Sequence, residues 1–141
     1  AAVNNNIGAA SSDTEAALDD AAGGLRGRSL VIVISDLLRP AEGILRGLRH
    51  LEHDGHDVTV IHVLDPGELD LGLEGLAEIR ELETGRRLLV DAGDMRESYR
   101  RAVERHLDRL RLGCAQSAVD YFQVSTKMAV EEAVHLRARR A

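Results

Sequence analysis

Several features that are common in proteins are scarce or missing in this chain of 141 residues. Its one cysteine, Cys114, cannot form an internal disulfide, which fits a reducing compartment or indifference to redox, and we expect a cytoplasmic protein. Because no run of about 18 apolar residues and no basic leader is present, the sequence predicts a soluble chain with no membrane segment. The net charge of −6 argues against a nucleic-acid partner.

The sequence motifs of common enzymes are missing as well. There is no nucleophile elbow, no Walker sequence and no Cys/His pair in a suitable context. Asp36 lacks the second nearby aspartate of an aspartyl-phosphate phosphatase, and the glycines at 23, 24 and 27 precede a strand, which is the wrong end for a phosphate-binding loop. We therefore expect a protein that is not an enzyme.

Short apolar runs alternate with amphipathic helical patterns along the chain. The runs predict strands over 29–36, 58–64 and 119–124, and the patterns predict helices over 13–26, 40–54, 94–117 and 128–139. The first run reads as a strand buried on both faces of a sheet. Strands separated by crossover helices predict an α/β fold with three layers and a mainly parallel, Rossmann-like sheet.

Two further segments differ from this alternation. Residues 1–12 are small and polar without a period, which predicts a flexible arm before a domain over 13–141. Residues 77–83 and 86–91 flank Thr84-Gly85 and alternate charged with apolar side chains. This pattern predicts an inserted β-hairpin that is mostly exposed.

Oxygen-bearing side chains follow the predicted strands. If the strands are parallel, Asp36, Asp65 and Ser125-Thr126 emerge at the same edge of the sheet, and the helix start at 12–14 opens there too. Carboxylates and hydroxyls suit a hard cation such as Mg²⁺. The alternative is that each of these residues only caps a helix or forms a turn.

Histidines and arginines have simpler interpretations. The spacing of His50, His53 and His56 could suggest a metal site, but we expect these side chains to lie on a solvated face. His62 lies within an apolar strand and is expected to be a hydrogen-bonded core residue. The arginines of 96–109 alternate with acids, and Glu97 precedes Arg101 by four residues, so an ion-paired exposed helix face is expected.

The ordered succession of ISD ending at Asp36, LDP at 64–66, LETG at 82–85 and the closing strand VDYFQVST resembles a known family. It is similar to the carboxyl-terminal half of bacterial von Willebrand factor A-like proteins, family 58 of the domains of unknown function, over about residues 12–140. The resemblance implies a partial von Willebrand A-type α/β domain. It also implies a metal-ion-dependent adhesion site, which captures an acidic group of a partner through divalent metal.

Residue by residue, the resemblance places the metal site at few positions. Asp36 matches the Asp loop, Ser12 and Asp13 fall where the family has Thr-Asp, and Thr14 is a neighbouring hydroxyl. The Asp-x-Ser-x-Ser loop has no counterpart in this chain, because it belongs to an upstream first strand. The resemblance thus implies Mg²⁺ in the intact protein and weak or no metal binding by this chain.

The function expected from these features is a non-enzymatic protein-interaction module. The resemblance implies work beside a MoxR-type AAA+ ATPase in complex assembly. Because the strand at 29–35 would lack a neighbour, we also expect self-association or pairing with the missing amino-terminal part. Two alternatives stay open: a metal-dependent hydrolase or phosphotransfer enzyme using Asp36, and a nucleotide-type small-molecule binding domain.

Overall fold

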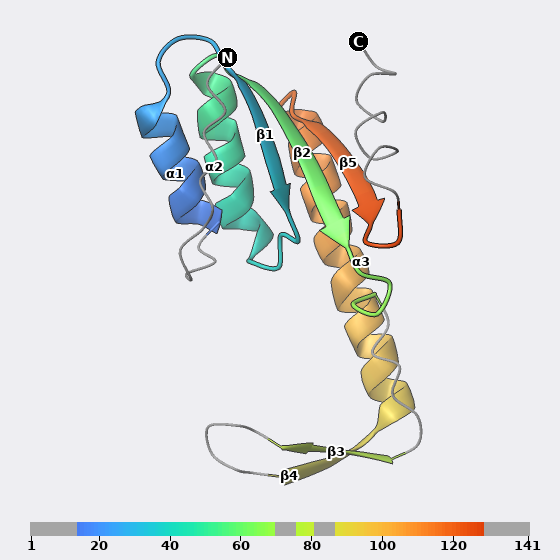
Figure 1. Ribbon diagram of the computed structural model, residues 1–141. Coiled ribbons are helices and arrows are strands. Elements are labelled where there is room, and N and C mark those ends of the chain that lie inside the picture. The colour runs from blue at the N-terminus through green and yellow to red at the C-terminus, as the bar shows by residue number, and fades with distance from the viewer. Residues whose placement is uncertain (1–13, 70–75, 81–86, 129–141) are drawn as a thin grey trace.

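The computed structural model describes residues 14–69, 76–80 and 87–128 (Figure 1). The helices and strands follow one another as α1 (Thr14–Gly24), β1 (Leu30–Ser35), α2 (Ala41–His53), β2 (Asp57–Leu64), β3 (Leu76–Arg80), β4 (Arg87–Asp91), α3 (Ala92–Gln116) and β5 (Asp120–Ser125). Each of these elements was predicted from the sequence, with ends that differ by a few residues. The helix expected over 128–139 and the arm 1–12 lie outside the described residues.

The three main strands form one parallel sheet in the order β1-β2-β5. Val33 of β1 lies beside Val60 of β2, which in turn lies beside Tyr121 of β5. The strands are connected through α2 and α3, so the predicted α/β class with a parallel sheet is confirmed and is compatible with a Rossmann-like fold. All three strands therefore end at the same edge, called here the carboxyl edge (Figure 1).

The core lies between one face of this sheet and the helices. Ile44, Leu48 and Leu51 of α2 are each at most 1% exposed, and they share a cluster with Val60 of β2 and Leu110 of α3. Burying each such side chain contributes roughly 1.5–3 kcal/mol. The described residues thus form two layers, and the third layer stays a prediction.

The prediction that strand 29–36 is buried on both faces is wrong for β1. Leu30, Ile32 and Ile34 are 51%, 46% and 67% exposed, whereas Val31 and Val33 between them pack against the core. The reason is that the described helices cover only the face of β1 that carries Val31 and Val33. A continuous apolar run does not report which of its faces is covered.

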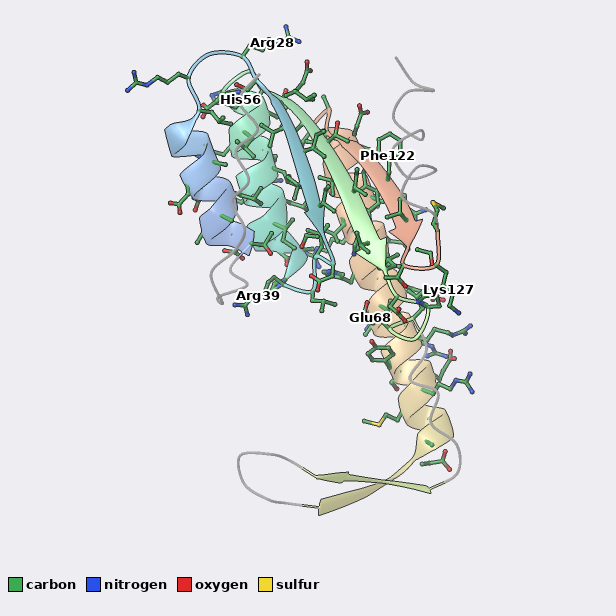
Figure 2. The ribbon with its side chains drawn as sticks, in the orientation of Figure 1. Arg28, Arg39, His56, Glu68, Phe122 and Lys127 are labelled. Carbon is green, nitrogen blue, oxygen red and sulfur yellow. The ribbon has the colours of Figure 1, made fainter. Side chains whose placement is uncertain are left out.

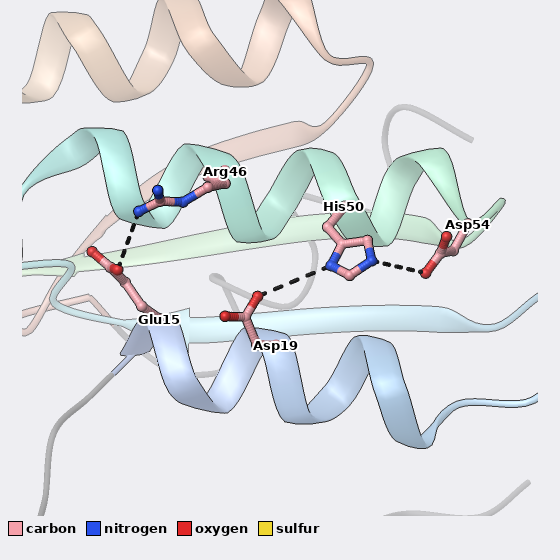
Figure 3. Close-up of polar contacts among 5 residues, drawn as sticks. All are labelled: Glu15, Asp19, Arg46, His50 and Asp54. Carbon is pink, nitrogen blue, oxygen red and sulfur yellow. Dashed lines mark hydrogen bonds and ion pairs between the residues drawn. The ribbon is translucent and has the colours of Figure 1, made fainter.

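α1 packs on α2 and extends the helical layer. Leu18 is 4% exposed and approaches α2 where Gly47 leaves room for it. Two ion pairs also join the helices, Glu15 to Arg46 at 3.5 Å and Asp19 to His50 at 4.0 Å (Figure 3). Exposed pairs of this kind contribute little, so apolar contact holds α1 in place.

The antiparallel pair β3–β4 confirms the pairing of the two strands of the predicted hairpin, whereas their predicted exposure stays a prediction. Figure 1 shows this pair beyond the first turn of α3 and away from the three-stranded sheet. Asp91 ends β4 and caps α3, because its carboxylate accepts hydrogen bonds from the amides of Gly93 and Asp94 at 2.8 and 3.4 Å. Thr84 and Gly85 at the predicted tip lie outside the described residues.

The histidine prediction is right for two residues and wrong for the third. His50 and His53 are exposed on α2, as expected, but His56 is only 7% exposed. Gly55, with φ +86°, ends α2 and turns the chain inward, a conformation that glycine adopts without strain. The His56 ring nitrogen Nδ1 then accepts a hydrogen bond from the Ser29 amide at 3.2 Å, next to the start of β1.

Candidate functional site

Asp36 and Leu37 form the turn that follows β1 at the carboxyl edge. Asp36 is exposed, and Leu37 is fully buried with φ +48°. The left-handed conformation costs an ordinary residue roughly 1–2 kcal/mol, so other contacts must hold this turn. One of them is local, because the Leu37 amide donates to the Ser35 hydroxyl at 3.1 Å.

Two histidines from other elements hold the same turn. Nε2 of His62, on β2, lies 2.8 Å from the carbonyl oxygen of Asp36. Nε2 of His106, on α3, lies 2.8 Å from the carbonyl oxygen of Leu37. Since a carbonyl only accepts hydrogen bonds, both rings carry a proton on Nε2. The turn after β1 is therefore fixed from β2 and from α3.

His62 is the hydrogen-bonded core histidine that the sequence predicted. It is 1% exposed, and its Nδ1 lies 2.6 Å from the Tyr121 hydroxyl, whose oxygen also accepts from Gln123 at 3.1 Å. Burial is the main cause that lowers the pKa of His62, and the hydrogen bond to the Asp36 carbonyl opposes it. The ring is thus neutral at pH 7, and Tyr121 donates to its Nδ1.

The ends of β2 and β5 also meet, as the sequence predicted. The Thr126 hydroxyl donates to the carboxylate of Asp65 at 2.7 Å, and the Gly67 amide donates to it at the same distance. The bond from Thr126 is the main reason that the pKa of Asp65 is lowered, followed by the bond from Gly67. The Asp65 carboxylate thus stabilises the turn that follows β2, which supports the alternative that this residue is a turn former and not a metal ligand.

A pocket of about 240 Å³ opens between this edge and α3. Asp36 and His62 line it from the strand ends, and Glu68 lines it from the loop after β2, where Figure 2 labels it. The Tyr99 hydroxyl on α3 donates to the backbone carbonyl of Glu68 at 2.7 Å, which fixes the loop against the helix. Most of the remaining wall is apolar and comes from both sides, namely Leu38, Leu64, Leu69, Ala102, Val103 and Leu107.

The structure brings together only part of the predicted metal site. Asp36 lies at the carboxyl edge, and α1 begins at that same edge with Thr14, while Ser12 and Asp13 lie outside the described residues (Figure 1). The side chains that line the pocket with Asp36 do not include Thr14. In the described part of the chain, no three His, Cys, Asp or Glu side chains gather as a metal site would require.

Sequence reasoning missed Glu68 and His106. The hydrogen bond of His106 to the carbonyl oxygen of Leu37 spans 69 positions in the sequence, so no local pattern indicated it. Glu68 follows Asp65-Pro66-Gly67. The sequence pattern there indicated a turn, and a turn gave no reason to expect a pocket. The available signal was the histidine of α3, His106, on the side of the helix that faces the sheet, where a polar ring needs a partner.

These features define an α/β domain with a parallel sheet and a small acidic pocket at its carboxyl edge. The family described as "Protein of unknown function DUF58" matches residues 3–109, so the chain belongs to this family. The resemblance seen in the sequence is confirmed at that level. No curated protein and no solved structure matches the chain. No helix among the described residues has the length and apolar character to cross a membrane.

Proposed function

We propose that this domain is a protein-interaction module that binds an extended polypeptide segment along the open edge of β1. One observation carries the proposal: among the described residues β1 pairs only with β2, and it exposes Leu30, Ile32 and Ile34 on the face that the described helices leave open. A strand with a free edge offers a row of backbone N–H and C=O groups to another strand.

The composition of β1 favours pairing at this edge. Natural proteins protect edge strands with proline, with charges that point inward or with bulges, whereas Leu30–Ser35 contains neither proline nor a charged residue. An apolar row also crosses the open face, because Ile34 lies beside Ile61 and Ile61 beside Phe122, which Figure 2 labels on β5. An added strand would bury part of this row, and backbone hydrogen bonds would set its direction.

The finer parts of the proposal rest on the family resemblance. They are a von Willebrand A-like relationship, a partner of the MoxR-type AAA+ class, and divalent metal near Asp36 and Thr14 in the intact protein. The placement of the metal is supported by the start of α1, which lies at the same edge of the sheet as Asp36. For the purified chain we propose a second copy as the partner at β1, since closed dimers are the commonest homo-oligomers.

Sedimentation velocity at micromolar concentration tests the proposal. We expect the chain to sediment as a dimer, with twice the mass of the 15.4 kDa monomer. Ile32→Lys places a charge at an edge position that is 46% exposed, so it should shift the equilibrium to monomer. Leu112→Lys is the matched control, because Leu112 is 62% exposed on α3, and it should leave the dimer intact. A folded wild-type monomer at all concentrations would contradict self-association.

A further inference from the structure

The pocket at the carboxyl edge combines carboxylates with an apolar wall. We infer that it receives a basic side chain, lysine or arginine, of a bound polypeptide. That the side chain belongs to a polypeptide rests on the proposed function, whereas the preference of the pocket for a cation does not. Asp36 enters the pocket from the end of β1, so the pocket adjoins the strand at which the polypeptide would bind.

The pocket carries a net negative charge. Asp36 and Glu68 line it together with the rings of His62 and His106, and no lysine or arginine does so among the residues that the structure describes. Burial is the main cause that lowers the pKa of His62, and the neighbouring His106 lowers it further, whereas the two carboxylates raise it and so act close to the ring. Because His62 is neutral, the two carboxylates leave the pocket with a net negative charge even where the His106 ring carries one positive charge.

The carboxylates retain the capacity to accept further hydrogen bonds. Glu68 accepts one bond from the Asp65 amide at 3.3 Å, and Asp36 accepts one from the Ser35 hydroxyl at 3.4 Å. An ionised carboxylate has about four acceptor sites, so an ammonium or guanidinium group would find free ones. A phosphate or carboxylate ligand would instead meet like charge.

The wall suits the stem of such a side chain. Leu64, Leu69 and Val103 line the pocket with carbon atoms, and lysine and arginine bury their methylene stems along surfaces of this kind. The volume of about 240 Å³ lies below the roughly 300–1,000 Å³ of pockets for drug-sized ligands. Size and charge together favour one basic side chain over a nucleotide.

Amide shifts in nitrogen-15 NMR spectra provide the first test. We expect n-butylammonium to shift the amides of Leu38, Ala102 and Val103, and n-butyrate at equal ionic strength to leave them unchanged. Glu68→Gln should weaken n-butylammonium binding roughly tenfold, equal to about 1.4 kcal/mol. Asp120→Asn is the matched control, because this exposed carboxylate lies at the opposite end of the sheet, and it should change nothing.

Peptides provide the second test and separate the two proposals. We use extended valine-threonine peptides with one lysine moved through each position, and the same peptides with acetyl-lysine. At least one of the lysine peptides should bind more tightly than n-butylammonium. The peptide with acetyl-lysine at the same position should lose this gain in affinity. Ile32→Lys should abolish peptide binding and leave n-butylammonium binding intact, because it alters β1 alone.

Each failure has a distinct meaning. Equal binding of n-butyrate, or n-butylammonium binding that Glu68→Gln does not change, would overturn the cation pocket. If n-butylammonium binds as expected but no lysine peptide does, the polypeptide source is wrong while the pocket's preference for a cation stands.

Discussion

His62 lies 2.8 Å from the carbonyl oxygen of Asp36, so a buried ring from β2 holds the residue that follows β1. The pKa of His62 is lowered from its usual 6.5, mainly by burial. Below about pH 6.5 the unfolded chain therefore binds a proton that the folded chain does not. The free energy of unfolding decreases as the pH is lowered from 6.5 to the pKa of the folded state. The stability that the neutral His62 ring contributes is therefore fully present only above pH 6.5.

The first prediction follows for urea unfolding between pH 5.5 and 7. His62→Gln should lower stability at pH 7, and it should remove from the pH profile a slope of at most about 1.4 kcal/mol per pH unit. His53→Gln is the control, because His53 is exposed on α2, and its profile should match that of the wild type. An unchanged slope in His62→Gln would show that the folded chain protonates His62 freely.

The second prediction concerns the contact between α2 and α3. A Cβ at Gly113 would overlap the side-chain carbons of Leu45, which is 7% exposed. Overpacking costs about 1–3 kcal/mol, and the gain in helix propensity offsets up to about 1. Gly113→Ala should thus destabilise the fold in urea unfolding. Gly23→Ala, with nothing within 4 Å of the added carbon, should be neutral or slightly stabilising.

How far the sequence predicted the fold can be seen from particular elements. The apolar runs at 29–36 and 58–64 identified β1 and β2 because strand composition is a local property. The exposure of Ile34 is not local, since it depends on which face the helices cover. The burial of His56 likewise depends on the positive φ of Gly55, which aims the chain inward.

The site was predicted less completely than the fold. Parallel strands place Asp36, Asp65 and Thr126 at one edge, and the bond between Asp65 and Thr126 confirms the principle. The pocket needs α3, whose His106 and Tyr99 reach residues that lie 69 and 31 positions away. Contacts over such distances leave no periodic signal in a single sequence.

The third prediction concerns divalent metal. Asp36 is exposed, and no three potential ligands gather in the described residues, so this chain should bind Mg²⁺ weakly if at all. Titration calorimetry should show no stoichiometric heat at millimolar Mg²⁺, and Asp36→Asn should not alter the trace. Tight one-to-one binding that Asp36→Asn removes would instead establish a metal site at Asp36.

The fourth prediction concerns the thiol of Cys114, which is 1% exposed. Burial raises its pKa to about 11, so almost no thiolate exists at pH 8. Ellman's reagent should therefore react with the native chain only as fast as the chain opens, and at once in denaturant. Rapid reaction of the native protein would show that the contact of α3 with the sheet opens readily.

The central claim is that the open edge of β1 binds another strand, and hydrogen exchange at Leu30–Ile34 tests it most directly. Alternate amides of a strand point to opposite neighbours, so those directed at β2 serve as an internal control. At micromolar concentration we predict that the outward amides are protected as well, and that Ile32→Lys removes this protection while the inward amides keep theirs. Outward amides that exchange freely in the wild type, alone and with the lysine peptides, would contradict the account.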